Sequence, residues 1–174
     1  MIINQNINIV GFVQSQQQEI DRMPVGITRD VGYGKAMVLF DKYPSVVKIL
    51  ENISDDIGTS GLSVTIKVTK PKISKTVCIP GWHIDTVRNF LDPRPLETHY
   101  LWVSHTGTEF LTNEIKLDET LGIIDFYDVV KDIKEERIFK CTPNTIVKYN
   151  RLNLHRGCPS ESNEKRLLIR VSKE

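Results

Sequence analysis

The sequence is poor in cysteine and lacks the cysteine patterns typical of a disulfide framework or a zinc ribbon. Its 174 residues include only three cysteines, at the widely separated positions Cys78, Cys141 and Cys158. No Cys-x-x-Cys pair occurs, and an odd number of cysteines does not suit a disulfide-stapled scaffold. We therefore expect reduced thiols in an intracellular protein.

An excess of charge of one sign is also missing. Lysine and arginine together number 23, and aspartate and glutamate 22, which gives a formal net charge of +1. Proteins that bind phosphate backbones are usually strongly basic, so this balance favours a small-molecule partner. Nucleic acid stays an alternative partner that the charge does not support, and nothing in the composition indicates an oligomeric state.

Long apolar runs are absent as well. No stretch approaches the roughly 20 apolar residues of a membrane span, and residues 1–22 lack the basic start and apolar run of a signal peptide. The sequence therefore predicts a cytoplasmic protein without membrane contact. With 40% hydrophobic and 26% charged residues, the composition is that of one globular domain. A chain of this length buries about 70% of its surface on folding, so it needs no structural metal.

Hydrophobic periodicity indicates one helix and a series of strands. Residues 44–53 have apolar side chains at helical spacing, with Pro44 suited to a first turn and Gly58 suited to a stop. After Gly61 the chain consists of short β-branched and aromatic segments separated by Pro, Gly and Asn. The expected strands are LSVTIKVTK (62–70), KTVCIP (75–80), THYLWVS (98–104), LGIIDFYDV (121–129), NTIVKYN (144–150) and RLLIRVS (166–172).

Consecutive strands without long helices between them favour a sandwich or barrel over a parallel βαβ sheet. The predicted fold class is α+β, mainly β, with one or more N-terminal helices packed outside the β core. We expect a single domain, residues 1–174. Within it, residues 1–70 would form a helical and strand support, and residues 71–174 the β core with the functional site.

A histidine and an aspartate two residues apart form the first candidate site. The side chains of His83 and Asp85 would point to the same side of an extended chain, so both could reach one metal ion. With four histidines and 22 acidic residues in the chain, such a pair arises by chance about half the time. The pair alone is therefore no better than a surface histidine beside an acid.

The C-terminal end adds a third candidate ligand and two arginines. His155 precedes a predicted strand on which Arg166, Arg170 and Ser172 share one face. Apolar residues at 167, 168, 169 and 171 indicate that both faces of this strand are covered. A buried arginine needs a carboxylate partner, because an unpaired buried charge is severely penalised. A solvated strand edge is the alternative for both arginines.

Two imidazoles and one carboxylate form the facial triad that suits non-haem Fe(II) and leaves positions open for a chelating cosubstrate and O2. In order and spacing these residues resemble the Fe(II)/2-oxoglutarate-dependent dioxygenases, and among them the taurine-dioxygenase-like branch. That family has His-x-Asp, a Gly-x-Thr-like strand segment, and a distal His followed after eleven residues by an Arg; taurine dioxygenase itself has a second Arg four residues further on. The matching residues here are His83, Asp85, Thr108, His155, Arg166 and Arg170.

The resemblance covers roughly residues 76–172 and implies a double-stranded β-helix (jelly-roll, cupin-like) core. It implies that the catalytic Fe(II) is bound by His83, Asp85 and His155. Arg166 would pair with the far carboxylate of 2-oxoglutarate, Thr108 would donate a hydrogen bond to it, and Arg170 would bind an anionic group of the substrate. Which of the two arginines holds 2-oxoglutarate stays open. The implied reaction couples decarboxylation of 2-oxoglutarate to hydroxylation of a small polar or anionic substrate.

Two departures from the family and several alternatives accompany this prediction. The interval from Asp85 to His155 is shorter than in taurine dioxygenase, and residues 1–70 resemble no family, so the substrate is not identified. A cupin-like protein that binds a metal or small ligand without oxygenase activity is one alternative, and a nucleobase or nucleotide hydroxylase is another. His99 and His105 are competing ligands, which we interpret as structural or substrate-lining.

Overall fold

The computed structural model describes residues 2–3, 6–79, 81–84, 97–112, 115–116 and 137–173. Three helices and eleven strands occur in this part of the chain. The helices are α1 (Gln17–Arg22), α2 (Tyr33–Leu39) and α3 (Pro44–Ile57). The strands are β1 (Ile2–Ile3), β2 (Asn8–Phe12), β3 (Gly26–Gly32), β4 (Leu62–Thr69), β5 (Thr98–Val103), β6 (Thr108–Leu111), β7 (Ile115–Lys116), β8 (Ile138–Lys140), β9 (Thr145–Asn150), β10 (His155–Gly157) and β11 (Arg166–Lys173).

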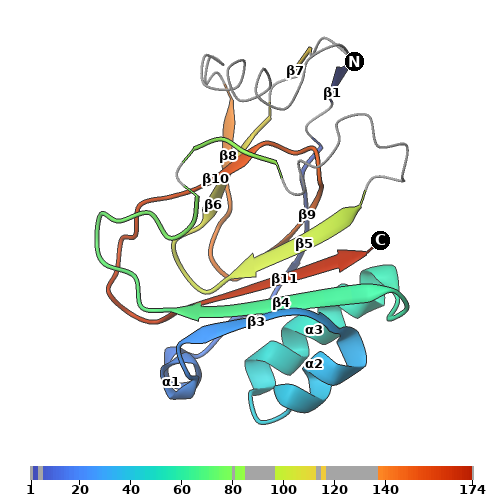
Figure 1. Ribbon diagram of the computed structural model, residues 1–174, viewed down its shortest axis with the longest axis vertical. Coiled ribbons are helices and arrows are strands. Elements are labelled where there is room, and N and C mark those ends of the chain that lie inside the picture. The colour runs from blue at the N-terminus through green and yellow to red at the C-terminus, as the bar shows by residue number, and fades with distance from the viewer. Residues whose placement is uncertain are drawn as a thin grey trace.

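A large antiparallel sheet with the strand order β2-β9-β5-β11-β4-β3 forms the centre of the molecule. A smaller antiparallel sheet, β10-β6-β8, lies over one face of it, and β1 pairs with β7. The helices cover the opposite face of the large sheet (Figure 1). The predicted class, mainly β with a double-stranded β-helix core and helices outside it, is confirmed. Within the described residues, no helix is long and apolar enough to cross a membrane.

Helix α3 forms where periodicity and capping predicted a helix. Its apolar side chains at four positions are completely buried: Val46, Ile49, Leu50 and Ile53. Pro44 occupies the first turn, where its missing N–H has no partner to lose, and Gly58 at the C-cap has a φ of 76°, which favours glycine. The helix prediction is confirmed, and the helix continues to Ile57.

Four of the predicted strands are present as β4, β5, β9 and β11. Of the described residues in the segment 75–80, Thr76 makes an isolated bridge with Pro159, and these residues form no strand. The expected strand at 121–129 lies outside the described residues. Periodicity gave no indication of α1, α2, β2 or β3, although β2 and β3 form the two edges of the large sheet.

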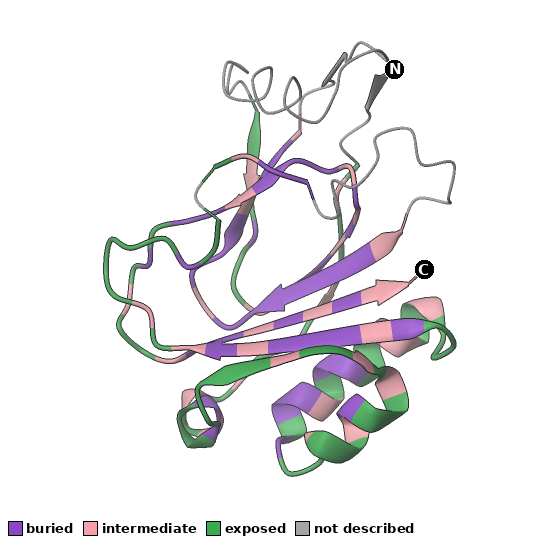
Figure 2. Ribbon diagram, in the orientation of Figure 1, coloured by how far each residue is buried: buried purple, intermediate pink, exposed green. Residues whose placement is uncertain are grey.

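Strand β11 runs through the middle of the large sheet, and its alternate residues serve different layers. Leu167, Ile169 and Val171 are completely buried in the core that the sheet shares with the helices. Leu168 and Arg170 point the other way, toward the small sheet, where they line a cavity. Figure 2 shows buried and half-buried residues alternating along β11.

Candidate functional site

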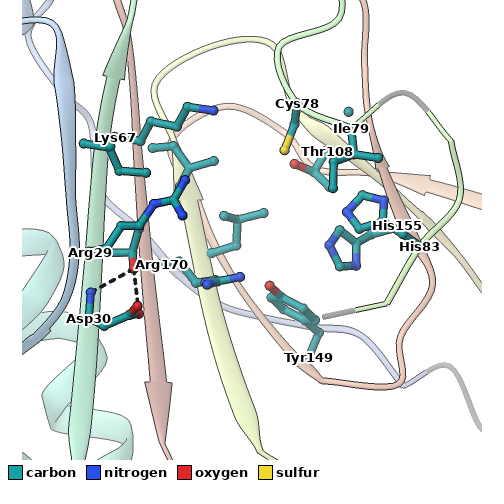
Figure 3. Close-up of a pocket in the computed structure, with 15 residues that line it drawn as sticks. Arg29, Asp30, Lys67, Cys78, Ile79, His83, Thr108, Tyr149, His155 and Arg170 are labelled. Carbon is teal, nitrogen blue, oxygen red and sulfur yellow. Dashed lines mark hydrogen bonds between the residues drawn. The ribbon is translucent and has the colours of Figure 1, made fainter. Parts of the chain in front are cut away.

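A cavity of about 280 Å³ lies between the large sheet and the small sheet. Its volume is close to the lower end of small-molecule sites, which run from roughly 300 to 1,000 Å³. Two histidines line one side, and cationic side chains line the side opposite (Figure 3). The predicted site residues that line it are His83, Thr108, His155 and Arg170. A ligand in this cavity therefore contacts imidazole and cationic groups together.

His83 and His155 are 72 positions apart in the chain but adjacent in space. Their backbones form an antiparallel bridge, in which His83 N donates to His155 O at 3.0 Å and His155 N donates to His83 O at 2.9 Å. Paired residues of such a bridge project to the same side. The two rings consequently lie with their centroids 4.3 Å apart, and the residues are 7% and 8% exposed.

Both imidazoles are held in one tautomer by backbone carbonyl groups. His83 Nδ1 lies 2.8 Å from Gly81 O, and His155 Nδ1 lies 3.0 Å from Asn153 O. A carbonyl oxygen can only accept a hydrogen bond, so each Nδ1 must carry the proton. In the neutral ring the lone pair is then on Nε2. Fixing a histidine through its other nitrogen is the usual arrangement around metal-binding imidazoles.

The separation of the two rings also suits a shared metal ion. With a metal–nitrogen bond of roughly 2.1 Å and a ring centre about 1.1 Å beyond the nitrogen, two imidazoles at right angles have centroids about 4.5 Å apart. The observed 4.3 Å is close to this value. The donor set and its spacing therefore fit two neighbouring positions of a metal coordination sphere.

Asp85, the predicted third ligand, lies outside the described residues, so the structure does not place it. Among the described residues, no group of three or more His, Cys, Asp or Glu side chains is arranged to hold a metal ion. The described cysteines form no disulfide. Burial raises the pKa of Cys141 to about 12 and that of Cys158 to about 11, so both are neutral thiols at pH 7. The pair of histidines is thus the part of the predicted metal site that the structure describes.

Aromatic rings surround His155 and restrict its movement. The ring of Phe110 lies 5.5 Å away and that of Tyr149 lies 5.7 Å away, centroid to centroid, and both residues are buried. Tyr149 also lines the cavity. Sequence reasoning assigned no role to Tyr149, although alternation along β9 places it on the same side as Val147, in the core between the sheets.

The two competing histidines do not line the cavity. His99 Nδ1 lies 2.8 Å from Ser172 Oγ, and its ring packs 5.2 Å from that of Tyr149. His105 Nδ1 lies 3.1 Å from Thr106 Oγ1. Both contacts are those of structural residues, and His99 supports a residue that lines the cavity.

Arg166 is buried beside the site but does not line the cavity. Its Nε donates to the backbone oxygens of His105 at 2.9 Å and Thr106 at 3.1 Å. Burial lowers the pKa of Arg166 to about 10. Cys78, which lines the cavity, and two other cysteines partly offset this lowering of the pKa. Within the described residues, Arg166 Nη2 is buried and has no hydrogen-bond partner. Because a lone buried cation is costly, this nitrogen fits a carboxylate supplied by a ligand.

A glycine allows the wall of the cavity to close around the histidines. A Cβ atom at Gly157, two residues after His155, would lie 2.8 Å from Cys78 Cβ and 2.9 Å from Cys78 N. Real Cβ atoms essentially never approach other heavy atoms so closely, so a larger residue would displace the segment that carries Cys78. Only glycine at position 157 therefore leaves room for Cys78 on one side of β10. Thr108, which pairs with Gly157, lies on the other side, and both Cys78 and Thr108 line the cavity.

No family model and no curated protein matches this sequence. Among solved structures, the chain is similar to AviO1 from Streptomyces viridochromogenes Tue57, with 10% identity, a TM-score of 0.52, and coverage of 98% of this chain and 90% of that chain. It is also similar to EvdO2 from Micromonospora carbonacea var. aurantiaca in complex with 2-oxoglutarate, with 13% identity, a TM-score of 0.49, and coverage of 87% and 67%. A further similar structure is the non-heme monooxygenase ThoJ, with 11% identity, a TM-score of 0.47, and coverage of 98% and 72%. At such identities the likeness to AviO1 shows a shared fold.

Proposed function

We propose that this protein is an Fe(II)- and 2-oxoglutarate-dependent oxygenase that hydroxylates a small polar or anionic substrate. The observation that carries the proposal is the bridged pair His83 and His155, with both Nδ1 atoms held by carbonyl oxygens and both rings on the cavity wall. Imidazole ligands in a site with open positions suit non-haem iron. Bound together with 2-oxoglutarate and O2, Fe(II) supplies the oxidising chemistry that couples decarboxylation to hydroxylation.

The ligand set proposed for the metal is His83, Asp85 and His155. The two histidines are supported by their geometry, and Asp85 by its position two residues after His83 in the sequence. A neutral imidazole pair and one carboxylate leave a divalent ion with a net positive charge. This charge attracts the anionic end of a chelating cosubstrate to the histidine side of the cavity.

The part of the chain proposed to hold the far carboxylate of 2-oxoglutarate is Arg166 together with Thr108. One buried nitrogen of Arg166 has no hydrogen-bond partner among the described residues, and Thr108 lines the cavity at 6% exposure. A guanidinium donates to a carboxylate with two parallel N–H groups, and a hydroxyl can donate one further hydrogen bond. The backbone oxygens of His105 and Thr106 fix the guanidinium through Nε, so its remaining nitrogens are oriented before a ligand arrives.

The remaining wall keeps water away from the reacting atoms. Leu101, Leu168 and Tyr149 line the cavity between the histidines and the cations, and none of the three is an exposed residue. Apolar walls lower the local dielectric constant and strengthen each electrostatic contact with the ligand. The substrate C–H bond is expected to lie against this apolar part of the wall.

The test is metal content and 2-oxoglutarate turnover measured on the same preparations. Wild-type protein is expected to bind about one Fe(II) per chain and to release succinate with ascorbate, 2-oxoglutarate and O2 present. The His83→Ala and Asp85→Ala variants should lose both, because each removes one of three ligands. His105→Gln is the matched control, since His105 does not line the cavity. Equal succinate release from all four proteins would rule out the proposal.

The same measurements separate the two alternative functions. Metal binding by the wild type without succinate release would indicate a cupin-like binding protein instead of an oxygenase. Succinate release that rises only when a nucleobase or nucleotide is added would identify a hydroxylase of that substrate class.

A further inference from the structure

Three cationic side chains line the side of the cavity that faces the two histidines. Arg29 comes from β3, Lys67 from β4 and Arg170 from β11, which are neighbouring strands of the large sheet. Figure 3 shows Arg29 and Arg170 extending into the space between this sheet and the histidines. The sequence analysis gave no role to Arg29 or Lys67. Arg29 is exposed and Lys67 is half-buried, but both line one cavity from different strands.

A β-bulge in the edge strand β3 lets Arg29 face the cavity while Val31, two residues later, faces the helical core. Thr28 pairs with Ile66 and Val31 pairs with Val64, so Arg29 and Asp30 together lie opposite the single residue Thr65. Ile27 and Arg29 consequently both line the cavity, whereas Val31 packs against the core shared with the helices. In a regular strand, residues 29 and 31 would point to the same side.

The bulge has its own stabilising contacts and a backbone cost. Asp30 has a φ of 51°, a left-handed conformation that aspartate tolerates better than most residues. Thr65 Oγ1 accepts a hydrogen bond from Asp30 N at 3.4 Å and donates one to Asp30 Oδ1 at 3.3 Å. Bulges are common beside functional sites, where they redirect a side chain. The bulge here adds Asp30 to the cavity lining beside Arg29 and places Val31 on the helical side.

Arg29 and Lys67 add two positive charges to the wall that Arg170 also lines, and Asp30 is the one acidic residue among the described residues that line the cavity. Within the described residues, neither Arg29 nor Lys67 forms an ion pair. Positive charge on an edge strand can also prevent strand pairing between molecules. That role does not explain Lys67, because β4 is an inner strand of the sheet.

We propose that this wall binds a substrate group with two negative charges, such as a phosphate monoester, opposite the metal site. A phosphate monoester carries a charge of about −1.5 to −2 at pH 7 and has three strong acceptor oxygens. The guanidinium fork of Arg29 and the ammonium group of Lys67 match a dianion in charge, and Arg170 lines the same wall. The inference deepens the proposed function, since it takes the cavity to be the substrate site of the oxygenase. It assigns Arg29 and Lys67 to specificity and does not involve the metal ligands.

Isothermal titration calorimetry of the metal-free protein tests the charge recognition directly. Inorganic sulfate, a permanent dianion, is the probe, acetate is the singly charged comparison, and ionic strength is held constant with chloride. We expect saturable sulfate binding that weakens by about tenfold or more in the double variant Arg29→Gln, Lys67→Gln, because two charge-assisted contacts are lost. The control, Lys35→Gln with Lys48→Gln, removes the same charge from the exposed side of the helical layer.

Three results would overturn the inference: no saturable sulfate binding, equal weakening in the two double variants, or acetate binding as tight as sulfate binding. A second titration, with Ni(II) and 2-oxoglutarate present, separates substrate from cosubstrate. Sulfate should still bind, and its displacement by 2-oxoglutarate would show that the cations hold the cosubstrate instead. The proposed function is tested separately, by succinate release without sulfate. Loss of the oxygenase proposal would therefore leave the anion site intact, and absence of sulfate binding would leave the oxygenase proposal intact.

Discussion

The two faces of the large sheet differ in what their side chains do, although the same strands build both. On the helical side, β11 presents Leu167, Ile169 and Val171 to a core that also includes Trp102, and all four are completely buried. On the cavity side, the same strand presents Arg166, Leu168 and Arg170, which are charged or only partly covered. Apolar burial on the helical face stabilises the fold, whereas burial of the Arg166 cation on the other face costs free energy. We therefore expect substitutions at the odd-numbered positions of β11 to change mainly stability, and substitutions at its even-numbered positions to change mainly ligand binding.

The largest expected effect is a difference in stability between substitutions of two adjacent residues of similar size, Ile169 and Leu168. Ile169→Ala should lower the free energy of unfolding by about 3–4 kcal/mol, because it leaves a cavity in a fully packed core. Leu168→Ala, on the cavity side, should cost about 1 kcal/mol, because part of that side chain is already exposed. Urea denaturation of the two variants measures the difference. Equal losses would show that the cavity face is packed as tightly as the helical face.

The parts of the fold that sequence predicted are those in which a local pattern is strong. Helix α3 has four buried positions at helical spacing between Pro44 and Gly58, and β11 has a continuous apolar pattern. The small sheet could not be predicted fully, because β8 and β10 have only three residues each and depend on their neighbours. Strand β3, with the sequence GITRDVG, resembles a loop because a bulge interrupts its alternation.

The candidate site was predictable where spacing along one strand or between motifs carried the information. His83 is indicated by its spacing to Asp85 and His155 by its spacing to Arg166 and Arg170, and the structure places the two histidines on one backbone bridge. Arg29 and Lys67 were missed because nothing in the sequence states that β3 and β4 follow β11 at the edge of the sheet. Strand order depends on contacts between distant segments, which local periodicity does not encode.

A smaller effect is expected on stability, and a clear one on ligand binding, when Arg166 is replaced by methionine. Loss of the hydrogen bonds to two carbonyls is offset by removal of a buried cation, so the free energy of unfolding should change by no more than about 1 kcal/mol. Burial lowers the pKa of Arg166 to about 10, so the charged form is penalised in the folded state at every pH below that value. The stability difference should therefore stay constant between about pH 6 and pH 9.

In the same Arg166→Met variant, affinity for 2-oxoglutarate measured with Ni(II) by calorimetry should fall by about a hundredfold, or roughly 2.7 kcal/mol. Metal affinity should be retained, because the proposed role of Arg166 is to bind the cosubstrate and not the metal ion. Arg170→Met is the matched control on the same strand and should keep its affinity for 2-oxoglutarate. The opposite pattern, with binding lost in Arg170→Met and kept in Arg166→Met, would exchange the roles of the two arginines.

The smallest expected effect concerns a polar contact on the helical face. Asp56, on α3, accepts hydrogen bonds from the hydroxyl of the buried Tyr100 and from Lys148 Nζ, and these donors lower the pKa of the Asp56 carboxyl. Because the folded-state pKa is below the unfolded value of about 3.9, the stabilising contribution is present above that pH and is lost as pH falls further. Asp56→Asn should cost about 0.5–1 kcal/mol at pH 7, since the carboxylate is partly exposed. Urea titrations should show this difference narrowing from about pH 5 toward pH 3, and Asp55→Asn, an exposed neighbour, should show none. A difference that does not depend on pH would assign the effect to packing and not to the charge of Asp56.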